Sequence, residues 1–540
     1  MSDGARRLRV VIVGFGPVGA RLCEELLPAV RIGLIELTVV GAEDDAPYNR
    51  VLVAEMAVER ADAASITLHD PQVSIDAGVR VLLGTKVIGI DRASRAVELS
   101  TGERVPFDRL VLATGARANV PTLAGIDRPA FDLSALSRSG SDAIAADPVL
   151  PAGITVLRDL ADAERVRAAV GERSRIIVLG AGVLGLELAL LAAGAGAEVS
   201  VVHHGPTPMP RSLDRGSGIV LARALRAGGV TVYAHSRAEA VAFRTEDGTA
   251  RTFDALLTAD GNYVRGDLLV LSCGVGARAE LATLAGLRTA AGIVVDAQLR
   301  SWTDENIFAI GDCAHIVERT ADTESMSRLP GTPSGLIGPG WRQAEWLGRQ
   351  LAAEASGMTR SAAAPTERDP VVMLKADEID VTAVGDVAVD VWDSPPPDEP
   401  APHRHVAEWA DPQHGRYLKL VTRDGILEAF ACVGMPRTGA ELTLLYDRRG
   451  ELPADRSLLL RLDGADGGAI ASDDAFAPTA TVCWCNGVTV QRIEDSVAAG
   501  SGTVACLGQD TRAGTGCGGC KPRLAELIDR FVAAGETAPA

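Results

Sequence analysis

The chain has no excess of positive charge and no long apolar run. Lys and Arg number 53 against 71 for Asp and Glu, which gives a formal net charge of −18. Because Lys and Arg provide the affinity for nucleic-acid phosphates and anionic lipids, this balance argues against nucleic acid and a membrane surface as partners. No segment reaches the roughly 18 consecutive apolar residues that a membrane-spanning helix needs. No apolar leader precedes the first predicted strand either. We therefore expect a cytoplasmic protein.

Cysteine is also scarce, with nine in 540 residues. In a reducing cytoplasm these thiols are expected to be ligands or buried side chains, not a disulfide framework. The length exceeds what one hydrophobic core supports, and a content of 47% hydrophobic residues can fill three or four domains. From residue 8 to about residue 355, short β-branched runs alternate with Ala- and Leu-rich stretches, which is typical of parallel sheets with crossover helices. The predicted fold class is α/β.

A glycine-rich turn follows the first predicted strand. The run LRVVIV is followed by GFGPVG and then by a helical stretch, the context that the G-x-G-x-x-G pattern requires. Gly14 allows the tight turn, Gly16 lets backbone amides approach a pyrophosphate, and Gly19 lets the helix pack on the strand. These glycines and Pro17 are predicted to bind a dinucleotide. Glu43, after the next apolar run, can accept hydrogen bonds from both ribose hydroxyls.

The pattern occurs again in RIIVLGAGVLGLELA, with Gly180, Gly182 and Gly185 in the same order. Such turns also arise for packing alone, but two of them, each between a strand and a helix, favour two dinucleotide sites. The following strand ends in His203 and His204, where the pattern leads one to expect an acidic residue. We include His204 among the candidate cofactor-binding residues, and the choice between NADH and NADPH stays open.

Two further motifs give the chain a family resemblance. ATGA at residues 113–116 follows an apolar strand, and IFAIGDCA at residues 307–314 places a Gly-Asp pair after another. Together with the two glycine-rich turns, they resemble the pyridine nucleotide-disulfide oxidoreductase superfamily. The resemblance implies FAD at the first site and NADH or NADPH at the second. It also implies that Asp312 hydrogen-bonds the ribityl chain of FAD and that Thr114 and Gly115 lie close to FAD.

The resemblance extends to two other positions. PYNRVLV, residues 47–53, is similar to the segment that runs past the flavin in this family, which implies that Arg50 lies near the FAD diphosphate. Glu187, in GLELA, matches a glutamate that contacts the nicotinamide amide in related reductases, and it is the candidate catalytic residue. A lone glutamate on a helix is equally consistent with an ordinary satisfied polar side chain.

One feature of the superfamily is missing. Its disulfide reductases carry a redox cysteine shortly after the first nucleotide motif, whereas residues 24–272 contain no cysteine. Relay of electrons through a thiol next to the flavin is therefore not expected. Cys23, Cys273 and Cys313 lie in apolar or Gly-rich runs, and we interpret them as small buried hydrophobic residues.

The C-terminal region holds two close pairs of cysteines. Cys483 and Cys485 are separated by one residue, and Cys517 and Cys520 by two. Four thiolates can hold a [2Fe-2S] cluster or a tetrahedral zinc ion. Zinc pairs usually span roughly two to four residues, so the first spacing favours the cluster. That spacing and the Gly-rich AGTGCGGCKP resemble the bacterioferritin-associated ferredoxin-like domain. Cys506, in the apolar VACL, is interpreted as a core residue.

The order of these motifs implies two Rossmann-like nucleotide-binding domains, a small α+β domain and a small C-terminal iron-sulfur module. The expected boundaries are an FAD-binding domain at 1–133 and 266–353, an NAD(P)H-binding domain at 154–265, an α+β domain at 370–461, a flexible linker at 462–480 and a [2Fe-2S]-binding domain at 481–535. This order resembles the electron-transfer subunit of assimilatory nitrate reductase and the N-terminal part of the NAD(P)H nitrite reductase large subunit.

The resulting hypothesis is an FAD-dependent NAD(P)H oxidoreductase that passes single electrons through a [2Fe-2S] cluster to a separate terminal reductase, with a molybdenum-containing assimilatory nitrate reductase as the first choice. The chain stops 20 residues after Cys520, so we expect it to lack the sirohaem region of nitrite reductase. Two alternatives stay open. One is the reductase component for a separate sirohaem nitrite reductase or an oxygenase, and the other is a zinc-stapled nucleotide-binding regulatory protein without turnover.

Overall fold

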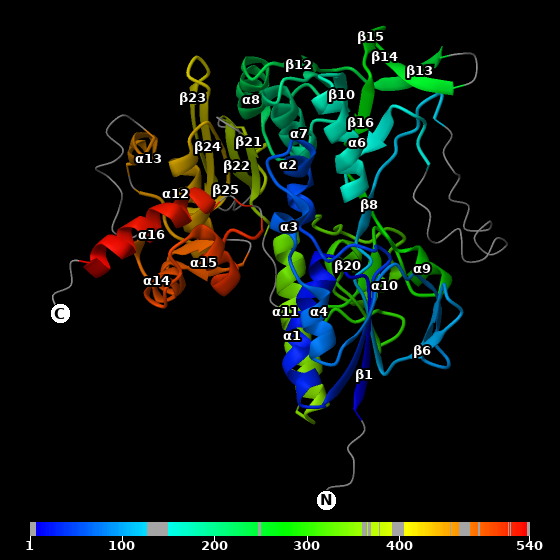
Figure 1. The fold of residues 1–540 in the computed structure, drawn as a ribbon. Coiled ribbons are helices and arrows are strands. Elements are labelled where there is room, and N and C mark those ends of the chain that lie inside the picture. The colour runs from blue at the N-terminus through cyan, green and yellow to red at the C-terminus, as the bar shows by residue number, and fades with distance from the viewer. Residues whose placement is uncertain are drawn as a thin grey trace, which may run out of the picture.

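The structure is a computed structural model. It describes residues 7–126, 149–246, 250–358, 364, 369–376, 379–390, 392, 404–453, 455–463, 476–483, 486–516, 518 and 520–536. These residues form the predicted succession of two nucleotide-binding units, an antiparallel sheet domain and a small C-terminal module, which confirms the α/β fold class (Figure 1).

The first unit is a five-stranded parallel sheet in the order β19–β7–β1–β2–β3. Val10, Val11 and Ile12 of β1 are almost fully buried, as expected for a parallel sheet covered on both faces. Helix α1 packs against the long helix α11 (Figure 1). The elements are β1 (Leu8–Val13), α1 (Pro17–Arg31), β2 (Ile35–Val40), β3 (Arg80–Leu82), β7 (Arg109–Leu112), β19 (Ile307–Ala309) and α11 (Ile337–Ala355).

Smaller elements complete this unit. An antiparallel sheet contains β4 (Val87–Asp91), β5 (Ala96–Leu99) and β6 (Arg104–Pro106), and a parallel pair contains β18 (Ile293–Val295) and β20 (Ala314–Ile316). The short helices are η1 (Arg50–Leu52), α2 (Val53–Ala57), α3 (Ala63–Ile66), α4 (Pro71–Asp76), α9 (Glu280–Leu284), η3 (Gly311–Cys313) and α10 (Ala321–Ser325).

The second unit repeats the arrangement with a parallel sheet in the order β12–β11–β10–β16–β9. Its elements are β9 (Ile154–Val156), α6 (Leu160–Gly171), β10 (Arg175–Leu179), α7 (Val183–Gly194), β11 (Glu198–Val202), α8 (Arg215–Ala227), β12 (Val230–Tyr233) and β16 (Leu268–Leu271). An antiparallel sheet of β13 (Ala238–Glu246), β14 (Ala250–Thr258) and β15 (Tyr263–Arg265) extends it.

The chain passes between the two units twice. The crossing segments β8 (Ala116–Ala118) and β17 (Val275–Ala277) pair antiparallel. Strand β19 then returns to the first sheet beside β7, so the first unit is discontinuous in sequence. The predicted return at residue 266 comes too early, because β16 pairs with β10 in the second sheet. The apolar pattern alone does not reveal which of two parallel sheets a strand joins.

The small α+β domain is an antiparallel sheet in the order β21–β22–β25–β24–β23. Its elements are β21 (Val372–Ala376), β22 (Ile379–Val384), β23 (Arg404–Asp411), β24 (Arg416–Arg423), β25 (Ile426–Val433), α12 (Pro436–Arg448) and α13 (Ser457–Arg461). It packs on the second unit, where the Tyr417 hydroxyl lies 2.5 Å from Asp214 Oδ2 and the Lys419 ammonium donates to the same oxygen at 3.2 Å.

The C-terminal module has a core of its own, which includes Val482, Ile493, Leu507 and Leu524. Its elements are β26 (Thr481–Cys483), β27 (Val488–Thr489), α14 (Val490–Ala498), α15 (Val504–Thr511) and α16 (Lys521–Glu536). Most of the predicted linker, residues 464–475, lies outside the described residues.

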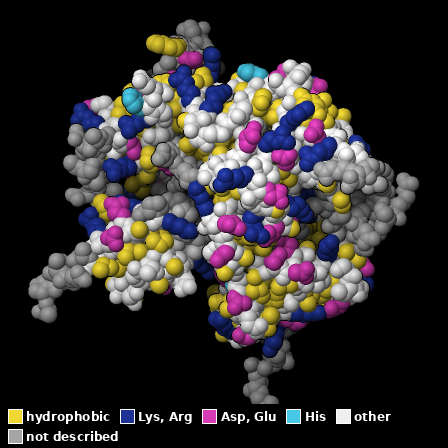
Figure 2. Space-filling view, turned by 45° about the horizontal axis from the view of Figure 1, so that its top comes forward, with side chains coloured by type: hydrophobic (Ala, Val, Ile, Leu, Met, Phe, Trp, Pro, Cys, Tyr) yellow, Lys and Arg dark blue, Asp and Glu magenta, His cyan; other side chains and the backbone are white. Residues whose placement is uncertain are grey.

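Charged side chains of both signs are mixed over the face shown in Figure 2. Among the helices that the structure describes, none is both long enough and apolar enough to cross a membrane.

Candidate functional site

The first glycine-rich turn is built against the ATGA segment. Gly14 has φ 106°, and a Cβ at this position would lie 2.2 Å from the carbonyl oxygen of Ala113. A Cβ on Gly19 would lie 2.0 Å from the carbonyl oxygen of Gly14. The Ala113 amide donates to the Val13 carbonyl at 2.8 Å, which joins the ends of β1 and β7. Two motifs that are about 100 residues apart in sequence therefore form one backbone arrangement that admits only glycine at its tight points.

The N-terminus of α1 is left open toward a cavity. Gly16 is the N-cap residue, and no side chain in the described part of the chain caps the first amides of this helix. The same is true of Gly182 at the start of α7, whereas Asp159 caps α6 and Asp214 caps α8 through their side chains. Uncapped amides and the positive end of the helix dipole suit an anionic group such as a pyrophosphate.

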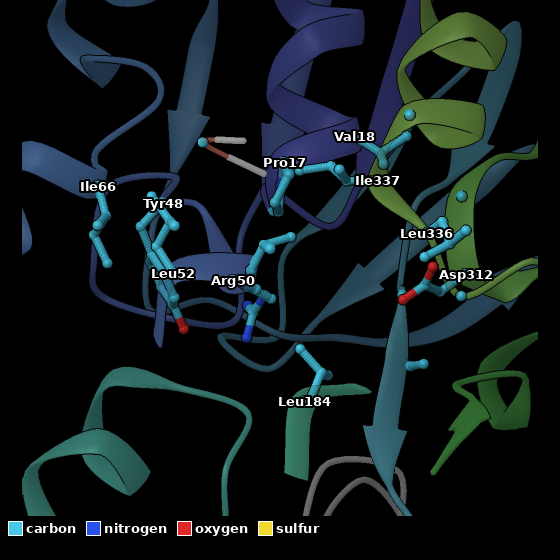
Figure 3. A pocket seen from close by; sticks show the side chains of 18 of the residues that line it. Pro17, Val18, Tyr48, Arg50, Leu52, Ile66, Leu184, Asp312, Leu336 and Ile337 are labelled. Carbon is cyan, nitrogen blue, oxygen red and sulfur yellow. The ribbon is translucent and has the colours of Figure 1, made fainter. Parts of the chain in front are cut away.

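A cavity of about 2280 Å³ begins at this turn. The predicted FAD residues that line it are Gly14, Gly16, Pro17, Glu43, Arg50, Thr114, Gly115 and Asp312. Figure 3 shows Arg50 between Tyr48 and Asp312. Leu184 of the second unit lies on the side of Arg50 opposite Pro17 in this view. Glu187 lines the same cavity. Of the described residues, the second-turn glycines and His204 do not line it.

Three charged contacts organise the lining of this cavity. Tyr48 donates to Glu43 Oε2 at 2.8 Å, and burial raises the pKa of its phenol, which therefore stays protonated. Arg50 forms an ion pair with Glu43. Asp312 is paired with Arg158 at 2.9 Å, and Arg158 lies in none of the motifs recognised in the sequence. The Glu43 carboxylate and the Arg50 guanidinium in the cavity lining, together with the uncapped N-terminus of α1, are groups that fit FAD.

The second turn has the same geometry. Gly180 has φ 117°, and its Cβ would lie 2.1 Å from the carbonyl oxygen of Ser272. A Cβ on Gly185 would lie 3.0 Å from the carbonyl oxygen of Gly180, whereas none of the described atoms lies within 4 Å of a Cβ on Gly182. Gly182 thus leaves room beside an uncapped helix, which fits the dinucleotide site predicted from the pattern.

The two histidines after β11 differ in environment. His203 is buried and His204 is exposed. Burial, together with the nearby His204, His235 and Arg226, lowers the pKa of His203 to about 4, and its Nε2 atom has no hydrogen-bond partner among the described residues. His204 is thus the accessible side chain at the end of this strand, where a nucleotide ribose is expected.

Two of the four predicted cluster ligands lie within the described residues. Cys483 is 2% exposed, and its thiol lies beside that of Cys520. The hydrogen bond from Cys520 and the amides of Gly514 and Asn486 lower the pKa of Cys483 to about 6 against the effect of burial. A lowered pKa favours the thiolate that metal ions bind. Cys483 and Cys520 also line the cavity that holds the predicted FAD residues.

Cys485 and Cys517 lie outside the described residues. No group of three His, Cys, Asp or Glu side chains suited to a metal is present in the part of the chain that the structure covers, where only half of the predicted set falls. The four-thiolate site therefore stays a prediction.

Cys23, Cys273, Cys313 and Cys506 were predicted to be interior side chains. Cys23 and Cys313 are buried, as predicted, and Cys273 is partly buried. Burial raises the pKa of Cys23 and of Cys273 to about 11. The interpretation of Cys506 as a core residue is wrong, because it is exposed on α15. In that helix Leu507 is fully buried, and one position along a helix turns the side chain to a different face.

Two Rossmann-type units around an open glycine-rich turn define an FAD- and NAD(P)H-binding oxidoreductase. The chain belongs to the pyridine nucleotide-disulphide oxidoreductase family, whose family model matches residues 8–329. A second family model, the BFD-like [2Fe-2S] binding domain, matches residues 481–530 and spans both cysteine pairs.

Curated relatives match nearly the whole chain. The "Assimilatory nitrate reductase electron transfer subunit" of Bacillus subtilis is 26% identical over 99% of this chain and 61% of its own length. The "Nitrite reductase (NADH) large subunit" of Escherichia coli is 27% identical over 98% of this chain and 56% of its own length. The chain thus spans less than two thirds of the length of these relatives.

Among solved structures, the covalent putidaredoxin reductase–putidaredoxin complex is similar with a TM-score of 0.63 at 22% identity, covering 85% of this chain and 100% of that chain. This likeness supports the fold.

Proposed function

We propose that the protein takes a hydride from NADH or NADPH onto FAD and delivers single electrons through a [2Fe-2S] cluster to a separate terminal reductase. The observation that carries this proposal is the shared cavity. Arg50 and Asp312, predicted to contact FAD, line the same cavity as Cys483 and Cys520, predicted to hold the cluster. Flavin and cluster would then face one continuous cavity, which supports electron transfer between them.

The side chains around the first turn would bind and orient FAD. The amides at the start of α1 and the Arg50 guanidinium would neutralise the diphosphate. Glu43, held by Tyr48, would accept from the ribose hydroxyls, and Arg50 would turn from Glu43 toward the phosphates when they are present. When bound, FAD takes up the hydride and a [2Fe-2S] cluster carries electrons one at a time.

The interface between the two units would position the nicotinamide. Asp312, fixed by Arg158, would accept a hydrogen bond from the ribityl chain. Glu187 and Leu184 come from α7 of the second unit and reach the same cavity. Glu187 would hold the nicotinamide amide there, while Leu184 would exclude water from the hydride path.

The terminal acceptor that we propose first is a molybdenum-containing assimilatory nitrate reductase. The support is the similarity to the Bacillus subtilis electron transfer subunit over nearly the whole chain. The similarity to nitrite reductases over a comparable span favours a second candidate, a sirohaem nitrite reductase carried on a separate chain. Adding each purified reductase to the NAD(P)H-reduced protein separates the two. Oxidation of the protein by only the nitrite enzyme would replace the first candidate with the second.

Metal content is the primary test of the proposed function. Protein purified without air should contain about two irons and two sulfides per chain. NAD(P)H should then bleach the flavin and produce the electron paramagnetic resonance signal of a reduced cluster. One tightly bound zinc with no iron would contradict the proposal and support the regulatory alternative.

A substitution separates flavin from cluster. Cys517→Ser should leave flavin reduction by NAD(P)H intact and abolish reduction of the acceptor protein. The matched control is Cys506→Ser, because that thiol is exposed and is not a predicted ligand. Loss of flavin reduction in a folded Cys517→Ser protein would show that the two cofactors do not have these separate roles.

A further inference from the structure

The C-terminal module docks on the first nucleotide-binding unit through a small set of polar contacts. On the module they involve Asn486, Arg512 and the loop residues Thr515 and Gly516. On the first unit they involve Arg21, Glu24 and Asn49. We call these seven residues the docking contact. They join segments about 470 residues apart in sequence.

Asn49 lies at the centre of the docking contact. Its side-chain amide donates to the carbonyl oxygens of Thr515 at 2.7 Å and Gly516 at 2.6 Å. Its Oδ1 atom accepts from the Val51 amide at 3.0 Å and caps η1, which fixes the orientation of the amide. Asn49 is 1% exposed, so both donors depend on these carbonyl groups.

Asn49 lies between the loop predicted to hold the cluster and the segment that lines the cavity. The two residues whose carbonyl groups accept from Asn49, Thr515 and Gly516, stand immediately before Cys517 in the sequence, and Cys517 is a predicted ligand. On the other side, Asn49 lies between Tyr48 and Arg50, which line the cavity predicted to hold FAD. One buried side chain therefore links the cluster-binding loop to the flavin-lining segment.

Arg21 forms a second link, from the helix whose N-terminus carries the first glycine-rich turn. It is 5% exposed, lies over the ring of Trp341 at 5.0 Å, and donates to Asn486 Oδ1 at 2.7 Å. The amide of Asn486 in turn donates to Cys483 Sγ at 3.7 Å and to the Arg512 carbonyl at 2.7 Å. Hydrogen bonds to a ligand sulfur tune a cluster as well as orient it.

An ion pair closes the contact at its edge. Arg512 Nη2 lies 2.7 Å from Glu24 Oε2, and Glu25 is also near, with its Oε1 at 3.9 Å from Arg512 Nη1. Arg512 is 41% exposed, so water and salt weaken this pair. The hydrogen bonds of the buried Asn49 and Arg21 side chains are therefore expected to contribute more to docking than the ion pair does.

We propose that Asn49 and Arg21 are positioning residues that hold the cluster-binding loop against the flavin-lining segment, and that this docked arrangement is the one in which the cluster is reduced. The inference rests on the proposed function. Each electron that leaves the flavin is gained by the cluster and then by the terminal reductase, so no further oxidant or reductant enters.

Asn49→Asp is the sharpest test in the full-length protein. The carboxylate keeps the size of the side chain and the acceptor that caps η1, but it loses both donors and faces two carbonyl oxygens. Loss of both hydrogen bonds, together with repulsion between the carboxylate and the two carbonyl oxygens, should slow cluster reduction by about tenfold or more. Flavin reduction by NAD(P)H should stay within about twofold of the unmodified protein, since no hydride contact changes.

Hydrogen exchange supplies a readout that does not depend on turnover. Amides of α15 and of residues 512–516 should exchange faster in Asn49→Asp, because the loop loses its anchor. The electron paramagnetic resonance signal of the dithionite-reduced cluster should keep its full intensity, which would show that the cluster is still bound. Asn119→Asp is the matched control: its amide donates to the Cys273 carbonyl at 3.4 Å, on an exposed side chain outside the docking contact.

A second variant keeps the proposal testable if Asn49→Asp does not fold. Arg512→Glu turns the ion pair with Glu24 into a repulsion and changes only an exposed side chain of the module. It should also slow cluster reduction and raise exchange, by less than Asn49→Asp. Unchanged exchange and unchanged cluster reduction in the folded variants would overturn the proposal. If NAD(P)H failed to reduce the cluster of the unmodified protein, the proposed function itself would fail.

Discussion

The two glycine-rich turns have the same backbone and different surroundings. In each, the first glycine has φ above 100° and would place a Cβ about 2 Å from the carbonyl oxygen at the end of a neighbouring strand, Ala113 in one unit and Ser272 in the other. In each, a glycine N-cap leaves the helix without a side-chain cap. This common framework suits the part that all dinucleotides share, the pyrophosphate.

The difference lies at the end of the next strand. After β2 the first unit offers Glu43, held by Tyr48 and paired with Arg50. After β11 the second unit offers an exposed His204 and a buried, uncharged His203. We infer that the turn would provide the affinity common to dinucleotides, whereas the strand end would distinguish one nucleotide from another. Substitutions at matching positions can test this division.

The largest effect is expected at the first glycine of each turn. Gly14→Ala should yield protein without FAD, because its Cβ would overlap a backbone oxygen that cannot move aside. Gly180→Ala should retain FAD but lose reduction by NAD(P)H. Flavin absorbance per chain and anaerobic bleaching measure the two outcomes. Gly171→Ala is the control, since a Cβ there meets no described atom within 4 Å. FAD loss in both variants would mean that the units do not act separately.

A smaller effect is expected at the second glycine. A Cβ on Gly182 has open space, so Gly182→Ala should keep the melting temperature of the protein. It should nonetheless raise the KM for NAD(P)H by about a hundredfold, since the methyl group occupies the path of the pyrophosphate. Thermal unfolding and initial rates check this. A lowered melting temperature with an unchanged KM would indicate that the glycine serves packing alone.

The buried histidine predicts a dependence of stability on pH. The pKa of His203 is lowered to about 4, so between about pH 6.5 and pH 4 the unfolded chain binds a proton that the folded chain does not. The free energy of unfolding should therefore fall as the pH falls through this range, by up to about 2 kcal/mol at pH 5 from this group. Urea titrations of the unmodified protein and of His203→Asn at about pH 7.5 and about pH 5 test it. An equal loss in both would assign the acid sensitivity to other groups.

The smallest effect is expected from adding an acid to the second unit. His204→Glu places a carboxylate at the position that corresponds to Glu43, where it can accept from ribose hydroxyls and repel a 2′-phosphate. The ratio of kcat/KM for NADPH to that for NADH should fall by about tenfold. The measurement is this ratio of kcat/KM values. Because His204 is exposed, the substitution is not expected to impair folding. An unchanged ratio would place the recognition of the ribose elsewhere.

Much of the fold and part of the site could be predicted because the signals are local. Strand, turn and helix follow one another within about 20 residues at each glycine-rich turn, and the succession of apolar β-branched runs and Ala- and Leu-rich helical stretches indicates the parallel sheets. The buried Cys23 and Cys313 were predictable for the same reason. The prediction that Cys506 is a core residue was wrong, because its apolar neighbours in the sequence do not indicate which face of α15 it occupies.

The two glycine-rich turns, the α/β class and the spacing of the C-terminal cysteines can be read from the chain alone, since each depends on residues close together along it. The pairing of β16 in the second sheet, the contact of Arg158 with Asp312 and the contact of Asn49 with the loop before Cys517 became evident from the folded structure. Those contacts join segments between about 90 and about 470 residues apart, where the chain pattern carries no record of distance. They depend on how whole domains pack, and that packing is fixed by the sum of many weak contacts.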